Sequence, residues 1–516
     1  MKEMIGLFSK AGFACALTLA LYGCGSGSSG TPAPTPTQAD QSDIVVAGSQ
    51  AGVTPFIASV KLTGQSVANL SSITFSIAPR PQSVSSAVKV NWSMTALKNR
   101  GYATGPTVNL PVFGLYASYS NAVTYTLTFS DNSTQTLQST ISTSSYTDPI
   151  GIYLNPTVVK ARAAGTTLGF NFFVLKSLAS PPVIVDTDGA LRWAAPGVTA
   201  STAAYFSNGE FVIGSEQNYD VTLLQMDGTH TALTPNLPQP LLNMFSHNLD
   251  SGPNGVLAEF SGTDALGTSY NDIVAEIAPF SDAAPYQTYD LATIISDYMT
   301  KNGDDATQFV RPGADWFHVN AATYDPNDDS VIVSSRENFL IKLDYKTHEI
   351  LWILGDPTKY WYTFPSLRAK ALTVPSPGLY PIGQHGVSVT SDGYVMVFND
   401  GFNSLQEPVG EPAGENRLFS EVTTYSVNTS TMTAQVVWHF DYGKTILSQI
   451  CGSSYEAAGK TYLVDFATAD AYKEARLVGL DANHNVVFDF AYQSPFDCAA
   501  AWNAIEVPME DMQISN

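Results

Sequence analysis

Lysine and arginine are scarce in this sequence. Charged residues make up 14% of its 516 positions, and 24 lysines and arginines face 46 aspartates and glutamates, which gives a formal net charge of −22. A protein that binds nucleic acid or an anionic membrane surface needs a strongly basic patch, and the sequence contains none. We therefore expect no nucleic-acid partner, and an anionic substrate would need a local cluster of arginine and histidine.

The apolar run at the N-terminus is too short to cross a membrane. Residues 11–22 are largely apolar, follow a basic start and end in Leu21-Tyr22-Gly23-Cys24. A membrane-spanning helix needs roughly 20 apolar residues, whereas this pattern is typical of an export signal and resembles a lipobox. We expect residues 1–23 to be a lipoprotein signal peptide and Cys24 to be acylated. Tyr22 replaces the more usual small residue, which leaves ordinary signal-peptide cleavage as the alternative.

Residues 24–43 have little that could form a core. They are rich in glycine, serine, proline and threonine, which is typical of a flexible linker. We expect the folded part to begin near Ile44, and the protein to be exported to the periplasmic side of the bacterial cell envelope. Gly25 after Cys24 is no obvious signal for retention at the inner membrane, so we expect the lipid anchor to lie in the outer membrane.

Cysteine is rare as well. Of the four cysteines, Cys15 lies in the signal and Cys24 at the expected anchor, which leaves Cys451 and Cys498. Export makes a disulfide between them chemically possible. Two buried free thiols are an equal alternative, because the sequence does not give the distance between the two Cα atoms.

Aromatic residues and glycine, by contrast, are plentiful, with 25 Tyr, 26 Phe and 38 Gly. They favour an all-β protein of short strands and tight turns, and the length favours two folded units. Residues 44–148 contain alternating runs at 74–77, 88–92 and 123–129, which predict half-buried antiparallel strands. We expect an immunoglobulin-like β-sandwich over 44–148. It contains no catalytic constellation.

Residues 149–516 are loosely repetitive. Two kinds of predicted hairpin recur, and two hairpins make a four-stranded sheet of the kind that propellers repeat around an axis. His247, His318 and His385 each open an inner-strand segment, at intervals of 71 and 67 residues, and are expected at equivalent positions. About 350 residues at roughly 70 per blade leave room for five or six blades.

The same three histidines mark the candidate site. His318 and Asn320 are two apart on a predicted strand and so share a face. A hairpin would return Arg336 to the level of His318. With His247 and His385, these donors suit a tetrahedral oxyanion. The alternatives are structural histidines, or a three-histidine metal site, which Arg336 would oppose.

Several of these segments resemble the bacterial arylsulfate sulfotransferases. The similarity covers most of residues 44–500 and is most specific between Asp315 and Gly401. It is carried by Asp315-Trp-Phe-His-Val-Asn320, Asp328-Asp329-Ser-Val-Ile-Val-Ser-Ser-Arg336, Leu351-Trp-Ile-Leu-Gly355, Gln384-His385 and Phe398-Asn-Asp-Gly401.

The resemblance implies an N-terminal sandwich and a six-bladed β-propeller. It also implies His385 as the nucleophile, with His247, His318, Asn320 and Arg336 binding the sulfuryl oxygens. Some family members carry a closely spaced cysteine pair just before the nucleophile, and residues 375–384 have none. Most described members are soluble periplasmic enzymes, so the expected lipid anchor is a second departure.

The expected function is transfer of a sulfuryl group from a phenolic sulfate ester to another phenol, by a ping-pong mechanism through a sulfohistidine. No cofactor or metal is required, and a homodimer is implied by the resemblance alone. The alternatives are a non-catalytic propeller that binds an anionic or aromatic ligand and, ranked last, a metal-dependent hydrolase or lyase.

Overall fold

The computed structural model describes residues 42–236, 242–264, 266–279 and 283–515. The expected signal peptide, Cys24 and nearly all of the expected linker lie outside these residues and stay predictions. Among the described residues, no helix combines the length and the apolar character needed to cross a membrane. The described chain is almost entirely β, as its composition predicts.

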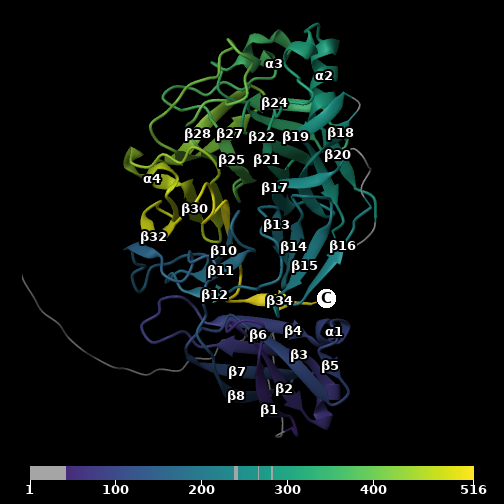
Figure 1. The fold of residues 1–516 in the computed structure, drawn as a ribbon, viewed down its shortest axis with the longest axis vertical. Helices are drawn as coiled ribbons and strands as arrows, with labels where there is room; N and C mark the ends of the chain where they lie inside the picture. The colour runs from purple at the N-terminus through teal and green to yellow at the C-terminus, as the bar shows by residue number, and fades with distance from the viewer. Residues whose placement is uncertain (1–41, 237–241, 265, 280–282, 516) are drawn as a thin grey trace, which may run out of the picture.

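The larger part of the chain forms a β-propeller. In the described residues, six sheets of four or five strands follow one another along the chain, and we number them blades 1 to 6 (Figure 1). The prediction of a six-bladed propeller is confirmed. The strands are, blade by blade, β10 (Phe172–Lys176), β11 (Val183–Asp186), β12 (Leu191–Trp193) and β33 (Asn503–Glu506); β13 (Ala204–Ser207), β14 (Glu210–Gly214), β15 (Val221–Gln225) and β16 (His230–Leu233); β17 (Met244–Ser251), β18 (Val256–Asp264), β19 (Gly267–Ile277) and β20 (Gln287–Asp290); β21 (Val319–Asp325), β22 (Ser330–Ser335), β23 (Leu340–Asp344) and β24 (Ile350–Leu354); β25 (Gln384–Val389), β26 (Val395–Asn399), β27 (Glu421–Asn428) and β28 (Thr433–Phe440); and β29 (Ser453–Ala457), β30 (Thr461–Thr468), β31 (Glu474–Leu480), β32 (Val486–Gln493) and β9 (Thr157–Lys160).

The centre of the ring is built by the first strands of the blades. β17 contacts β13 and β21, β25 contacts β21 and β29, and β29 contacts β33. Strand β33 pairs antiparallel with β10, with Ile505 opposite Val174. A strand from the end of the chain therefore completes blade 1 and closes the ring, which leaves no open edge between the first and last blades.

Residues at the N-terminus form two further sheets that pack together. The rings of Phe75 and Phe113, one from each sheet, lie 5.4 Å apart edge to face. β3 and β7 alternate buried and exposed residues, as their period of two predicts. The two sheets support the expected sandwich, whose immunoglobulin-like topology stays a prediction. The strands are β1 (Val45–Ala51), β2 (Ile57–Thr63), β6 (Thr107–Phe113) and β5 (Ala103–Thr104) in one sheet, and β34 (Met512–Ile514), β4 (Val88–Ser93), β3 (Leu70–Ile77), β7 (Ser120–Phe129) and β8 (Thr134–Ser142) in the other.

The last strand, β34, joins the two parts of the chain. It pairs in parallel with β4, with Gln513 opposite Asn91, and lies between the propeller and the N-terminal sheets (Figure 1). All of residues 149–516 were expected to belong to the propeller, whereas β34 pairs with a strand of the N-terminal sheets. A three-residue strand carries too weak a periodicity to reveal a partner about 420 residues away.

A buried arginine also joins the propeller to the sandwich. Arg192 of β12 has no exposed surface, and its Nε and Nη2 donate to the carbonyl of Gly114 at 3.1 and 2.6 Å. Its Nη1 lies 2.9 Å from Asp186 Oδ2, and its guanidinium lies 3.7 Å from the ring centre of Tyr116. Because the cation meets a carboxylate, a carbonyl and an aromatic face, its burial is compensated.

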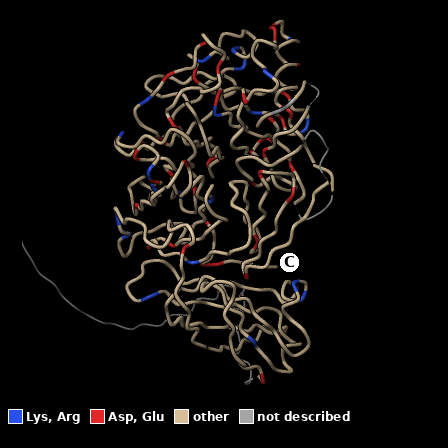
Figure 2. Tube along the Cα trace, in the orientation of Figure 1, with Lys and Arg blue, Asp and Glu red and all other residues tan. Residues whose placement is uncertain are grey.

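Short helices connect the strands. The two α-helices α2 and α3 contact each other beside blades 3 and 4 (Figure 1). Figure 2 shows acidic residues spread over the propeller, few charges on the sandwich and no basic cluster on the described trace. The helices are η1 (Gln65–Asn69), α1 (Met94–Asn99), α2 (Leu291–Lys301), η2 (Ala306–Gln308), η3 (Tyr360–Thr363), α3 (Pro365–Arg368), η4 (Tyr442–Lys444) and α4 (Ala469–Tyr472).

Candidate active site

The three predicted histidines lie where the first strands of blades 3, 4 and 5 begin. Each of these strands has a register shift near its start, so one or two residues are unpaired and the side chains there are redirected. His247 lies among the unpaired residues of β17, whereas His318 directly precedes β21, whose unpaired residue is Asn320. Both histidines have a left-handed backbone, with φ of 39° and 52°. The two histidines thus share a backbone conformation but not a register position relative to the bulge.

His385 lies one residue before the left-handed position that His247 occupies in β17. In blade 5 the left-handed residue is Gly386, with φ of 55°, and His385 precedes it. A Cβ at Gly386 would lie 2.9 Å from the Cα of Ser453 in blade 6, so the close approach of two first strands favours glycine here. The three histidines thus lie at the starts of successive first strands, each at a different register position.

The imidazoles nevertheless gather around one point. The ring centres of His247 and His318 lie 4.5 Å apart. The ring of Trp502 lies 5.1 Å from His247 and 5.8 Å from His385, so it contacts both. Trp502 was not among the predicted site residues, because it reaches the site only through the ring-closing strand β33 that follows it.

His247 is electrostatically constrained. Burial lowers its pKa well below the usual range, and the neighbouring imidazoles of His318 and His385 lower it further. Its Nδ1 forms a hydrogen bond with the hydroxyl of Ser246. His247 is therefore neutral near pH 7 and can donate or accept one hydrogen bond through Nε2.

His318 has an acidic partner. Its Nδ1 lies 2.5 Å from Asp315 Oδ2, and both side chains are about one quarter exposed. A carboxylate beside Nδ1 fixes the orientation of the ring and leaves Nε2 as the atom available to a ligand. The pair therefore has the arrangement of a general acid and base.

His385 is more deeply buried than the other two, with 3% of its surface exposed. Its Nδ1 lies 3.1 Å from the carbonyl oxygen of Gly383 and 3.1 Å from Asp400 Oδ2. Both neighbours are acceptors, so Nδ1 carries the proton and Nε2 has the lone pair. A neutral imidazole in this tautomer is a nucleophile through Nε2.

Asn320 and Arg336 complete the predicted set. Asn320 Nδ2 donates to the carbonyl of Gln384 at 2.8 Å, and its Oδ1 has no hydrogen-bond partner among the described residues. The amide of Arg336 donates to the carbonyl of His318 at 3.0 Å, which places Arg336 at the level of His318 as the hairpin predicts. Asn320 thus contacts Gln384, the residue before His385, and Arg336 contacts His318.

The guanidinium of Arg336 is fixed from several sides. Nη1 donates at 3.1 Å to both Glu337 Oε1 and the carbonyl of Asn403, and Nη2 donates to the carbonyl of Gln449 at 3.2 Å. Its Nε is buried and has no hydrogen-bond partner among the described residues. One buried donor therefore remains for a ligand or a water molecule.

Cys451 and Cys498 form a disulfide with a Cα separation of 6.5 Å, which answers the alternative that the sequence left open. Both cysteines pack in one buried cluster with Trp502. The bridge therefore ties the start of blade 6 to the segment that carries Trp502 into β33. Among the described residues, no group of three or more His, Cys, Asp or Glu side chains could ligate a metal ion.

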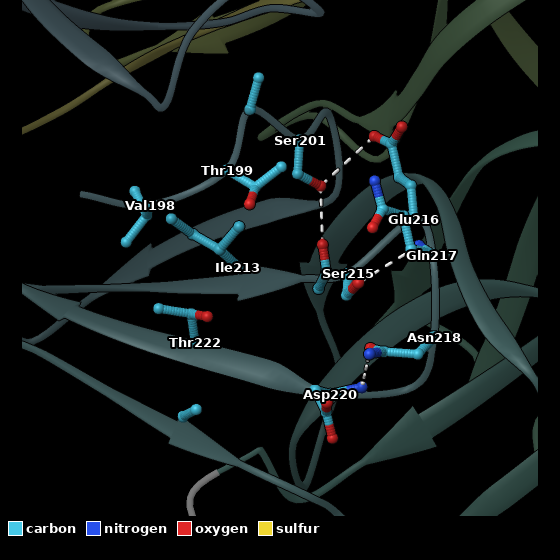
Figure 3. Close-up of a pocket in the computed structure, with 13 residues that line it drawn as sticks. Val198, Thr199, Ser201, Ile213, Ser215, Glu216, Gln217, Asn218, Asp220 and Thr222 are labelled. Carbon is cyan, nitrogen blue, oxygen red and sulfur yellow. Dashed lines mark hydrogen bonds between the residues drawn. The ribbon is translucent and has the colours of Figure 1, made fainter. Parts of the chain in front are cut away.

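A pocket of about 510 Å³ opens on blade 2 beside this site (Figure 3). The carbonyl of Ser215, which lines it, accepts a hydrogen bond of 3.0 Å from Phe245, two residues before His247. Its charged lining residues are Glu216 and Asp220, and the Glu216 carboxylate accepts a hydrogen bond from Ser201. Because its charges are negative, this pocket does not suit a sulfate group.

Comparisons with known proteins agree with this arrangement. A family model described as Arylsulfotransferase (ASST) matches residues 156–503. The arylsulfate sulfotransferase AssT of Escherichia coli O6:H1 is 30% identical over 150 residues, which are 26% of this chain and 24% of that protein. AssT of Lelliottia amnigena is 30% identical over 146 residues, 25% of this chain and 23% of that protein. The chain thus aligns with about a quarter of the length of these relatives.

Two solved structures are distantly similar. A europium-containing methanol dehydrogenase has 10% identity and a TM-score of 0.32, covering 75% of this chain and 77% of its own. The β-propeller domain of Myceliophteria thermophila Cps50 (Swd1) has 12% identity and a TM-score of 0.34, covering 66% of this chain and 90% of its own. The propeller assignment therefore rests on the chain's own six sheets.

Proposed function

This chain belongs to the arylsulfotransferase family, and on that premise we propose that it moves a sulfuryl group from a phenolic sulfate ester to a second phenol. The proposed intermediate is a sulfohistidine at His385. The observation that carries the proposal is the environment of His385. The residue is buried, its Nδ1 faces the carbonyl of Gly383 and the carboxylate of Asp400, and its Nε2 remains for a substrate near the imidazoles of the site.

In the first half-reaction, Nε2 of His385 attacks sulfur. The N–S bond forms while the S–O bond to the donor phenol breaks, and the electron pair leaves with the phenolate. A phenol has a pKa of about 10, so the phenolate leaves without strong assistance. His318, oriented by Asp315, would act as the general acid that gives a proton to the departing oxygen.

In the second half-reaction, the acceptor phenol replaces the first. Its oxygen attacks sulfur, the N–S bond breaks and the electron pair returns to Nε2 of His385. The proton of the acceptor hydroxyl passes to His318, which restores the protonated ring for the next cycle. Donor and acceptor thus use one site in turn, as a ping-pong mechanism requires.

The remaining site residues would bind the sulfuryl oxygens. His247 is neutral, so its Nε2 can direct an N–H at one oxygen without adding a repelling or attracting net charge. The unpaired Nε of Arg336 and the second N–H of the Asn320 amide are further donors. Fixed donors around a transferred anionic group lower the barrier because they need little reorganisation.

The cellular location and assembly are part of the same proposal. We infer an exported protein that is anchored through Cys24 in the outer membrane and that forms a homodimer, with a boundary between sandwich and propeller at residues 148 and 149. The disulfide between Cys451 and Cys498 supports export, because such bonds persist in oxidising compartments.

The proposal is tested by mass spectrometry of the protein after brief mixing with 4-nitrophenyl sulfate. We expect an adduct of about +80 Da that maps to His385, is absent in His385→Ala and is discharged by added phenol. His230→Ala, which changes an exposed histidine of β16, is the matched control and should form the adduct normally. If the folded protein forms no adduct and releases no nitrophenol, the proposed function is wrong.

A further inference from the structure

A buried carboxylate lies next to the proposed nucleophile and was not among the predicted site residues. Asp400 follows β26 directly and has no exposed surface. Its Oδ2 lies 3.1 Å from Nδ1 of His385, on the side of the ring opposite to the attacking nitrogen. Neither oxygen of Asp400 forms a well-aligned hydrogen bond with the described residues. The carboxylate therefore acts on the ring through its charge.

The position of Asp400 is set by the backbone around it. The carbonyl of Asp400 accepts a hydrogen bond of 2.8 Å from Ser420, and the next amide donates to the carbonyl of Ile382 at 3.1 Å. Gly383 has φ of 58°, and a Cβ there would lie 3.2 Å from the Cβ of Asp400. The backbone of Asp400 is thus held beside Gly383, where a side chain in place of glycine would press against the aspartate.

Charged groups from two segments face Asp400, namely His385 of β25 and the pair Arg336 and Glu337 that follows β22. Burial raises its pKa, whereas the nearby His385 and Arg336 oppose that rise and Glu337 adds to it. Glu337 is itself paired with Arg336 and accepts hydrogen bonds from Ser404, so most of its charge is compensated. The pKa of Asp400 is raised overall, because the effect of burial exceeds the opposing effect of His385 and Arg336.

We propose that Asp400 is a positioning residue that stabilises the cationic form of the sulfated His385, a role that rests on the proposed function. When Nε2 bonds to sulfur and the phenolate leaves, the ring retains the proton on Nδ1 and becomes an N-sulfoimidazolium. Gly383 fixes that proton by its carbonyl, and Asp400 supplies the opposite charge. Without the carboxylate, this buried cation would lose its counter-ion, and the intermediate would be less stable.

Loss of the Asp400 charge should therefore affect the two half-reactions differently. A less stable intermediate forms more slowly, because the positive charge is partly developed in the transition state. The same intermediate is discharged as fast as before or faster, because discharge removes the charge. A merely structural role would instead disturb the whole site and slow both steps.

The test uses Asp400→Asn, which keeps the shape and removes the charge. Adduct formation with 4-nitrophenyl sulfate and its discharge by phenol are followed separately in single turnovers. We expect formation to slow by about 100-fold, less than the loss seen when an oriented histidine also changes tautomer, since Gly383 still fixes the proton. Discharge should not slow, and the KM for the donor should change little, because Asp400 does not touch the substrate.

The matched control is Asp465→Asn, which changes another fully buried aspartate, in β30 of the next blade. It should form and discharge the adduct like the wild type. If Asp400→Asn forms the adduct at the wild-type rate, or loses both half-reactions equally, the role of Asp400 is wrong while the proposed function stands. If the wild type itself forms no adduct, the proposed function fails, and this inference fails with it.

Discussion

Replacing Arg192 with methionine would remove the cation between blade 1 and the sandwich. The variant loses the ion pair of 2.9 Å with Asp186 and both hydrogen bonds to the carbonyl of Gly114. Methionine retains apolar contact with the ring of Tyr116, which the guanidinium now covers at 3.7 Å. The substitution therefore tests the polar part of the contact with little change in volume.

The size of the effect follows from the burial of the pair. Neither Arg192 nor Asp186 has exposed surface, and removing one partner of such a pair costs about 3–5 kcal/mol. Asp186 keeps two backbone donors, Ala190 at 2.9 Å and Asp188 at 3.1 Å, so part of its charge stays solvated by the protein. We expect the free energy of unfolding to fall by about 3 kcal/mol near pH 7.

The same change makes stability depend on pH. Burial raises the pKa of Asp186, and Arg192 opposes that rise. Without Arg192 the pKa in the folded state rises further above its unfolded value of about 3.9. The folded state then binds the proton more tightly, so stability decreases as the pH rises from about 4 through the folded pKa, by up to ~1.4 kcal/mol per unit.

Urea unfolding at pH 5 and pH 8 separates the two effects. Arg192→Met should be destabilised more at pH 8 than at pH 5, relative to wild type. The double variant Arg192→Met/Asp186→Asn should lose this extra dependence, because no carboxyl remains to titrate. Arg368→Met, which changes an exposed arginine of α3, is the control. A loss below about 1 kcal/mol at both pH values would refute the reasoning.

Two further predictions concern the cysteines. The bridge between Cys451 and Cys498 spans 47 residues, so its loss in Cys451→Ala/Cys498→Ala should lower the free energy of unfolding by about 4 kcal/mol. Reductant should shift the urea midpoint of the wild type and leave that of the variant unchanged; an unshifted wild type contradicts this. Acylation at Cys24 predicts that a labelled fatty acid enters the wild type and not Cys24→Ala, and equal labelling contradicts it.

The sequence predicts those features that are encoded locally. The half-buried strands β3 and β7 follow from a period of two, and the blades follow from hairpins whose turns lie between apolar strands. The level of Arg336 follows from a hairpin in the same way. Each of these inferences needs only residues close in the chain, where strand register is set by the turn.

Features that depend on ring closure are not encoded in that way. Trp502 reaches the imidazoles because β33 pairs with β10, and that pairing joins residues more than 300 positions apart.

Asp400 is different, because its signal is local. The hairpin of β25 and β26 pairs Gln384 with Asn399, so the next residue, Asp400, must lie near Gly383 and His385. Counting residues across the turn would have identified it.

A shift of one residue in register separates the histidines into two kinds. His247 and His318 have a left-handed backbone at the start of their strands, remain partly exposed and contact each other. In blade 5 that position is taken by Gly386, so His385 is moved one residue back, is buried and faces Asp400. In the proposed function, these strand starts thus supply an oxyanion-binding imidazole in His247, a general acid and base in His318 and an oriented nucleophile in His385. Because only glycine fits against Ser453, a side chain at position 386 should disturb the nucleophile before it affects the other two histidines.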